Sequence, residues 1–270
     1  MTASPFLTPP RLVATDLDGT LLRSDGTVSE RTRRALRMVE ATGAEVVFVT
    51  ARPPRYVDAI AEGAGHEGTA ICCNGAIVYD VPGRQFLDAR LMPTAVAHKA
   101  AEALVAALPG STLALETGYR LISERDFGKK DFQEVIVESA AELWEADEDI
   151  VKLLVHSDRH HADLMMTASH DAALTDVEVT HSGGSGMLEI SSPGVTKAGT
   201  LALWCAARGI AASEVVSFGD MPNDLSTLTW AGAGYAMGNA HPDVLAATPL
   251  RAAANDDDGV ARVLEQLYGS

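Results

Sequence analysis

Asp16-Leu17-Asp18-Gly19-Thr20 is the stretch that decides the fold of this chain. It follows an apolar run over residues 11–15, which is typical of a buried strand. Two carboxylates two residues apart at a strand end can serve one metal ion and one reaction centre, and a glycine after them lets the backbone approach a ligand. The pattern predicts a site for a phosphate group and a divalent cation. The alternative is a plain Asp/Gly turn after a strand.

Helical and extended patterns alternate after this turn. Residues 29–42 have a helical pattern, with Ser29 as a suitable N-cap. Residues 45–49 form a continuous apolar run, as in a strand covered on both faces. A second helix over 53–62 and a third strand over 69–73 continue the series. Strand, helix, strand, helix, strand predicts a parallel α/β sheet.

The pattern then changes to neighbouring pairs of strands. Asn74-Gly75 divides two apolar runs and predicts a hairpin turn. Residues 111–116 and 120–124 form another pair around a Thr-Gly-Tyr turn. Paired strands with segregated helices are typical of an α+β module. Alternation of strands and helices resumes after Pro193 and ends in a helix predicted over residues 256–267.

These patterns predict an α/β fold with a Rossmann-like parallel-sheet core and helices on both faces. The core is expected to comprise residues 11–82 and 192–270. Residues 83–191 are expected to form an inserted α+β domain, and residues 1–10 a flexible tail.

The amino-acid composition excludes some classes of binding partner. The chain has 270 residues, a net charge of −16 and a pI near 4.8. Nucleic-acid binding would need a basic patch, and anionic lipid a polybasic face, so we expect neither partner. The overall negative charge of the protein would repel a phosphate ligand. A metal ion and local basic residues would therefore have to make the site positive. No feature of the sequence predicts an oligomeric state.

The cysteines point to a reducing compartment, and the histidines give no sign of a metal site. Cys72, Cys73 and Cys205 fit neither a disulfide framework nor a zinc site, so we expect buried thiols. Residues 1–10 lack the charged and apolar regions of a signal peptide, which favours a cytoplasmic location. The eight histidines show no metal-binding spacing, and we expect most of them at the surface.

A second acidic cluster, residues 219–224, repeats the layout of the first. It has the sequence Gly-Asp-Met-Pro-Asn-Asp and follows an apolar run over residues 214–218. In a parallel sheet, ligands sit outside the carboxyl ends of the strands, so both clusters should meet at one edge. Magnesium prefers oxygen ligands, which Asp16, Asp220 and Asp224 could supply.

Two further residues stand where a phosphate site would need them. Thr50 ends the strand at residues 45–49, with Arg52 two positions later. Lys197 begins the helix that follows Pro193. A lysine at a helix N-terminus opposes the helix dipole, and a cluster of carboxylates with a phosphate would offset this cost.

The order of these motifs resembles the haloacid dehalogenase superfamily of phosphohydrolases. The order comprises DxDGT, a strand ending in Thr, a Lys and GDxxND. The insertion is similar to the cap domain of the Cof-type sugar-phosphate phosphatases, in which it sets substrate specificity. The resemblance covers nearly the whole chain, from Arg11 to Arg262.

The resemblance implies a role for each motif residue. Asp16 would be the nucleophile that forms an aspartyl-phosphate, and Asp18 the general acid and base, with its carbonyl ligating Mg²⁺. Lys197 would neutralise charge at the reacting group. The metal ligands would thus be Asp16, Asp18, Asp220 and Asp224. The substrate- or phosphate-binding residues would be Thr50, Arg52, Asn74 and Asn223.

The sequence departs from the family pattern at two places. Ala51 stands where many relatives have glycine between Thr and Arg, and Ala198 separates Lys197 from Gly199. Neither change removes a reactive group. A hairpin turn explains Asn74 nearly as well as a role near the ligand does.

The resemblance predicts a Mg²⁺-dependent phosphatase for a small phosphorylated metabolite, of which sugar phosphates are the expected class. The alternatives are a phosphosugar mutase with the same aspartyl-phosphate and a non-catalytic protein that binds a phosphometabolite. Candidate substrate contacts in the insertion, which the sequence does not rank, are Glu116, Arg120, Arg125, Lys129, His181 and Ser182.

Overall fold

The chain folds as two compact units in the computed structural model, which describes residues 6–128, 133–146, 148–183 and 186–269. The core unit comprises Met1–Leu87 and Thr196–Ser270, and the inserted unit comprises Asp88–Val195. These divisions lie a few residues beyond those expected at residues 82 and 191.

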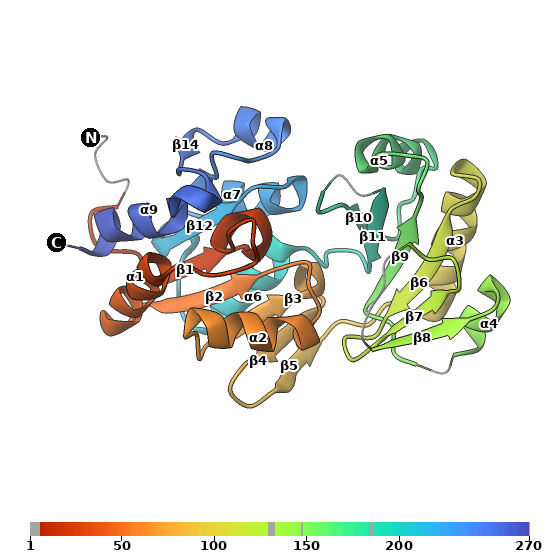
Figure 1. Ribbon diagram of the computed structural model, residues 1–270, viewed down its shortest axis with the longest axis horizontal. Coiled ribbons are helices and arrows are strands. Elements are labelled where there is room, and N and C mark those ends of the chain that lie inside the picture. The colour runs from red at the N-terminus through yellow and green to blue at the C-terminus, as the bar shows by residue number, and fades with distance from the viewer. Residues whose placement is uncertain (1–5, 129–132, 147, 184–185, 270) are drawn as a thin grey trace. The chain divides into compact units, whose positions relative to one another are not determined.

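The core unit is built on one sheet (Figure 1). Its strands lie in the order β14-β13-β12-β1-β2-β3-β4-β5, and they run parallel from β14 to β3 while β4 pairs antiparallel with β3. The apolar runs form the central strands because both of their faces are buried. The strands are β1 (Leu12–Thr15), β2 (Glu45–Val49), β3 (Thr69–Cys72), β4 (Ile77–Asp80), β5 (Gln85–Ala89), β12 (Val215–Gly219), β13 (Ala233–Ala236) and β14 (Leu250–Arg251).

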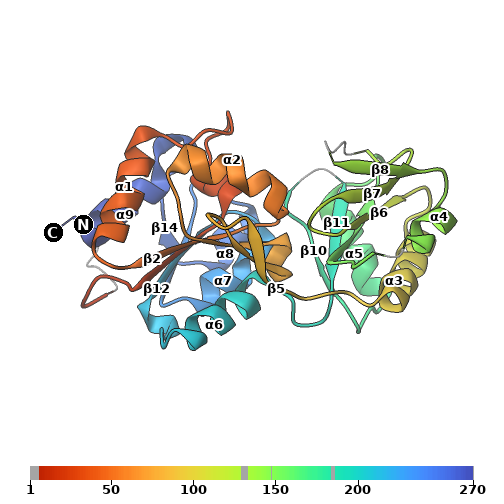
Figure 2. The ribbon, with the colours of Figure 1, turned by 90° about the horizontal axis from the view of Figure 1, so that it is seen from below.

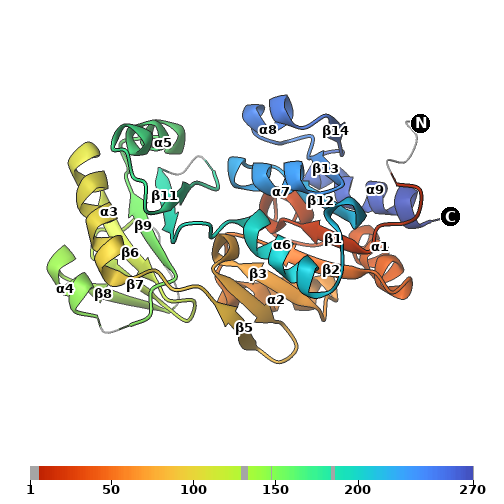
Figure 3. The ribbon, with the colours of Figure 1, turned by 180° about the vertical axis from the view of Figure 1, so that it is seen from behind.

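Helices cover both faces of this sheet, as predicted. α1, α2 and α9 lie on one face and α6 and α7 on the other (Figures 2 and 3). Ser29 caps α1 by accepting a hydrogen bond from the Thr32 N–H at 3.0 Å. The helices of this unit are α1 (Glu30–Ala41), α2 (Pro54–Ala64), α6 (Lys197–Ala207), α7 (Leu225–Trp230), α8 (Pro242–Ala247) and α9 (Gly259–Tyr268).

The inserted unit is a mixed sheet with helices on one face (Figure 1). Its strands lie in the order β10-β11-β9-β6-β7-β8. Alternate residues such as Leu113, Leu153 and Ile190 join the helices in an apolar core, so their neighbours in sequence point to the opposite face. The elements are α3 (Thr94–Ala107), β6 (Thr112–Glu116), β7 (Leu121–Glu124), β8 (Glu134–Val137), α4 (Ala140–Glu145), β9 (Lys152–His156), α5 (Ala162–Asp171), β10 (Glu178–Thr180) and β11 (Met187–Ser191).

One local prediction is wrong, and another holds with two exceptions. The last helix begins at Gly259, because Asp258 has a left-handed backbone with φ +57° and separates the helix from a short 3₁₀ turn over Asn255–Asp257. Six of the eight histidines are at least partly exposed, as predicted, whereas His66 and His181 are buried. The His66 ring packs against the ring of Phe48 at an interplanar angle of 32°, with centroids 4.1 Å apart.

Three further sequence features can be located in the structure: the cysteines, the N-terminal residues and the lengths of the helices. The three cysteines are buried, as predicted. Residues 1–5 of the predicted tail lie outside the described residues, and Pro10 is buried with its carbonyl accepting a hydrogen bond from the Tyr268 hydroxyl at 2.8 Å. None of the helices formed by the described residues combines the length and the apolarity needed to cross a bilayer.

Candidate active site

The loops that follow β1, β2 and β12 meet at one edge of the core sheet. The strands pair in parallel, with Thr15 opposite both Phe48 and Phe218. Asp16, Thr50 and Asp220 therefore leave neighbouring strands at nearly the same level. This is the carboxyl edge of the sheet, where open α/β folds place their ligands.

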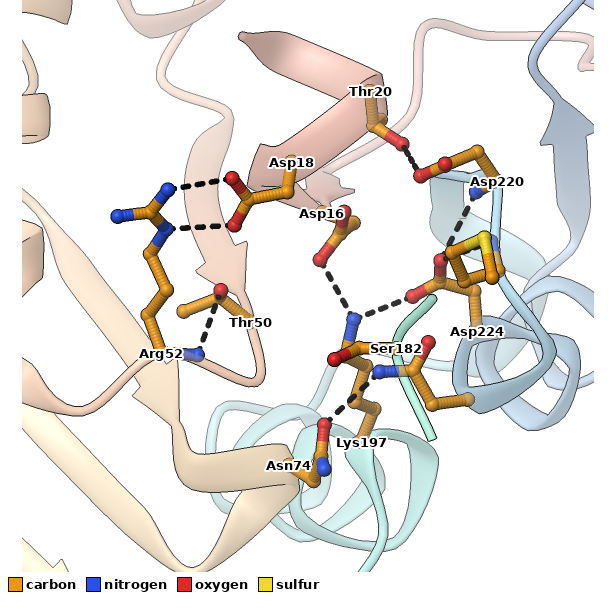
Figure 4. Close-up of polar contacts among 12 residues, drawn as sticks. Asp16, Asp18, Thr20, Thr50, Arg52, Asn74, Ser182, Lys197, Asp220 and Asp224 are labelled. Atoms are coloured by element: carbon orange, nitrogen blue, oxygen red, sulfur yellow. Dashed lines mark hydrogen bonds and ion pairs between the residues drawn. The ribbon is translucent and has the colours of Figure 1, made fainter. Parts of the chain in front are cut away.

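Lys197 lies between two carboxylates (Figure 4). Its Nζ donates to Asp16 Oδ1 at 2.7 Å and to Asp224 Oδ1 at 2.6 Å, and only 2% of the residue is exposed. Burial works against the charged ammonium, but the two carboxylates outweigh it and raise the pKa of Lys197. The lysine is therefore a fixed cation, which explains its place at the positive end of α6.

Asp220 is held by the first motif. Thr20 Oγ1 donates to Asp220 Oδ1 at 2.8 Å. Gly19 has a φ of +72°, and a Cβ on it would lie 2.3 Å from Asp220 Oδ2. Only glycine meets both demands without displacing the carboxylate. The turn therefore needs its glycine for a close approach to Asp220.

The site holds more negative charge than Lys197 alone can balance. Burial, followed by the nearby Asp224 carboxylate, raises the pKa of Asp220 to about 7. Burial also raises the pKa of Asp16, although Lys197 opposes that shift. A protein can relieve such crowding by binding protons or a cation.

A divalent cation fits this donor set. Carboxylate oxygens of Asp16, Asp220 and Asp224 lie within 4.8 Å of one another, and all three residues are buried. Oxygen donors suit a hard cation such as Mg²⁺. Asp224 is oriented by its Oδ2, which accepts hydrogen bonds from the backbone N–H groups of Asp220 at 3.0 Å and Met221 at 3.1 Å. Asp18 was predicted to ligate the metal through its backbone carbonyl, and its carboxylate is not part of this group, so that role stays a prediction.

Asp18 faces Arg52 instead (Figure 4). The guanidinium donates from Nε to Oδ2 and from Nη2 to Oδ1, both at 2.6 Å. The side chain of Thr50 accepts a hydrogen bond from the Arg52 N–H at 3.1 Å, which fixes the backbone of this loop. Arg52, predicted to bind substrate, is thus bonded to the predicted acid and base.

Asn74 and Asn223 form a third contact at this edge. Asn223 Nδ2 donates to Asn74 Oδ1 at 3.1 Å, and Asn74 has a left-handed backbone with φ +56°. Asn223 Oδ1 is buried and has no hydrogen-bond partner among the described residues. Buried polar atoms are normally satisfied, so this atom is consistent with a ligand or water at the site.

The candidate contacts of the inserted unit are scattered. Arg120 and Arg125 form exposed ion pairs with Glu148 and Glu138. Ser182 donates to Glu189 at 2.6 Å. Glu116 and His181, in contrast, are buried. Lys129 lies outside the described residues.

Two features of the structure were missed from the sequence. Asn239 Nδ2 donates to the Gly19 carbonyl at 2.8 Å, so the loop after β13 also supports the first motif. Its place after a core strand could have indicated this. In the inserted unit Lys152 and Glu189 form a buried ion pair, which no local pattern reveals because the two residues meet only through strand pairing.

Comparisons with known proteins agree with this geometry. Residues 13–264 match the family of haloacid dehalogenase-like hydrolases. The chain is 27% identical to pyridoxal phosphate phosphatase YbhA of Escherichia coli, over 94% of this chain and 97% of that protein. It is 26% identical to 5-amino-6-(5-phospho-D-ribitylamino)uracil phosphatase YitU of Bacillus subtilis, over 97% and 98%. The structure of a haloacid dehalogenase-like hydrolase from B. subtilis superposes with a TM-score of 0.83 at 27% identity, covering 95% of this chain and 99% of that one. The chain therefore belongs to the haloacid dehalogenase-like hydrolase family, as a member of the Cof type.

Proposed function

We propose that this protein is a Mg²⁺-dependent phosphatase that hydrolyses small phosphorylated metabolites through an aspartyl-phosphate on Asp16. The observation that carries the proposal is the buried contact of Lys197 with both Asp16 and Asp224, beside the Asp220 carboxylate. A carboxylate nucleophile and a phosphate dianion repel each other, so a fixed cation at the nucleophile is what the reaction requires.

The chain's own residues supply most of the mechanism. Asp16 attacks phosphorus while Lys197 stabilises negative charge on the nucleophile and the phosphoryl group. Asp18 gives a proton to the leaving oxygen and later takes one from water. A bound Mg²⁺, held by Asp16, Asp220 and Asp224 with the Asp18 carbonyl, would supply further positive charge at the phosphoryl oxygens.

The phosphoryl group itself would be held by short polar side chains. Thr50 and Asn223 are proposed to contact its oxygens, Asn223 through the same amide that bonds Asn74. Arg52 is proposed to act at the same edge of the sheet, where it bonds Asp18. Splitting the transfer into two displacements lowers the barrier of each.

The substrate is proposed to be a small phosphate ester with a polar, largely neutral leaving group, such as a sugar or polyol. A net charge of −16 disfavours polyanionic partners such as nucleic acids. The relatives YbhA and YitU are named for small phosphorylated metabolites. Residues 83–191 are proposed to form the substrate-selecting cap. The three buried cysteines favour a cytoplasmic location.

A panel of phosphorylated metabolites tests the proposal. With Mg²⁺ present, we expect release of inorganic phosphate from an aryl phosphate and faster release from hexose or pentose phosphates. A chelator should stop both reactions. Undiminished turnover after complete metal removal would contradict the mechanism. Transfer of the phosphoryl group to another sugar position would instead identify a mutase, and binding without turnover a sensor.

Metal binding should also be visible without any substrate. Because Asp220 has a pKa of about 7, protons compete with the metal below neutral pH and are displaced above it. We expect Mg²⁺ to raise the Tm of the parent protein more at pH 8 than at pH 5.5. The Asp220→Asn variant lacks this carboxylate, so Mg²⁺ should raise its Tm much less than it raises the Tm of the parent. Equal shifts at both pH values would contradict the assignment of Asp220 as a ligand.

A further inference from the structure

The contact between Arg52 and Asp18 joins two loops of the core unit. Asp18 comes from the turn after β1, and Arg52 from the loop after β2. Both carboxylate oxygens accept a guanidinium N–H at 2.6 Å, from Nε and Nη2. Two parallel bonds fix the plane of the carboxylate as well as its position.

The arginine is itself anchored on both sides. Its N–H donates to Thr50 Oγ1 at 3.1 Å, and its carbonyl accepts a hydrogen bond from the Cys73 N–H at 3.0 Å. The guanidinium carbon lies 5.8 Å from the centroid of the Tyr56 ring, within the range of a cation–π contact. These contacts restrict where the guanidinium can point.

Stability does not explain this pair. The Arg52 and Asp18 side chains are 36% and 53% exposed. Exposed ion pairs contribute little to folding free energy because water screens them. What the bidentate geometry does provide is a carboxylate held in one position and one orientation.

We propose that Arg52 is a positioning residue that holds Asp18 as the base for the second half of the reaction; this rests on the proposed function. In that step the oxygen of a water molecule bonds to phosphorus and the bond from phosphorus to the Asp16 oxygen breaks. One proton of the water passes to an Asp18 carboxylate oxygen. The products are inorganic phosphate, the free Asp16 carboxylate and protonated Asp18, which gives its proton to a later leaving group or to solvent.

This role differs measurably from direct binding of substrate by Arg52. The ratio kcat/KM reports the steps up to formation of the phosphoenzyme, whereas kcat also contains its hydrolysis. A residue that serves only the hydrolysis step changes kcat and KM together and leaves their ratio alone. A residue that binds substrate changes KM and the ratio.

The experiment compares the parent with Arg52→Gln on an aryl phosphate whose leaving group needs no proton. We expect kcat to fall by about tenfold to a hundredfold, because a mispositioned base costs this much. KM should fall by a similar factor, so that kcat/KM stays within about threefold. A rapid burst of the aryl alcohol, close to one per enzyme molecule, should precede the slow phase.

Two further variants make the result specific. Arg52→Lys keeps the charge but not the two-pronged geometry, so its kcat should lie between those of the parent and Arg52→Gln. Arg33→Gln is the matched control, because Arg33 is 37% exposed and pairs with Glu30 on α1. Its kinetics should equal those of the parent.

The outcomes separate the inference from the proposed function. A raised KM with kcat retained, or a lowered kcat without a burst, overturns the positioning role of Arg52 while the phosphatase stands. A parent protein that turns over no phosphate ester under any metal condition overturns the proposed function, and the inference with it.

Discussion

Replacing Asp16 by Asn should abolish phosphatase turnover and leave the fold intact. The amide keeps the shape of the side chain but cannot attack phosphorus, so we expect a loss of at least about a thousandfold in kcat. The fold should survive because Lys197 keeps its contact with Asp224 at 2.6 Å. Steady-state kinetics and circular dichroism measure the two expectations.

The control for Asp16→Asn is the same substitution at an exposed position. Asp171 ends α5 in the inserted unit and is exposed, so Asp171→Asn should behave like the parent. A rate for Asp16→Asn within about tenfold of the parent rate would show that Asp16 is not the nucleophile.

Lys197→Met should impair both activity and stability. Methionine has a similar length without the charge, so the site loses its fixed cation, and kcat should fall by at least about a hundredfold. Removing one partner of a buried ion pair costs about 3–5 kcal/mol of stability. The free energy of unfolding, measured with urea, should therefore also fall.

Lys197→Arg separates charge from shape at this position. Arginine keeps the positive charge but carries it on a wider planar group, so its effect on stability should be smaller than that of methionine. If Lys197→Met remains folded and retains more than about a tenth of the parent kcat, Lys197 has no part in neutralising the reacting group.

The sequence could predict that the candidate residues lie at one place because they follow strand ends. In a parallel sheet, motifs that follow buried strands lie at the same edge, so Asp16 and Asp220 could be placed at one edge without a structure. Lys197 was identifiable because a lysine is unfavourable at a helix N-terminus unless anions lie nearby.

Contacts that depend on side-chain direction could not be predicted in this way. Arg52 was expected to bind substrate, since position alone does not show that its guanidinium points at Asp18. The buried pair of Lys152 and Glu189 depends on strand pairing within the inserted unit. The start of α9 at Gly259 was missed because the sequence does not show that Asp258 has a left-handed backbone, which interrupts the helix.

Detection of the phosphoryl group on Asp16 tests the central claim most directly. The Asp18→Asn variant, which lacks the base for hydrolysis, would be mixed with an aryl phosphate and Mg²⁺, quenched in acid and mapped by mass spectrometry. We predict one phosphoryl group on the peptide that contains Asp16, formed in step with release of the aryl alcohol. Release of the alcohol with no phosphoryl group on the protein, or with the group on another residue, would contradict the account.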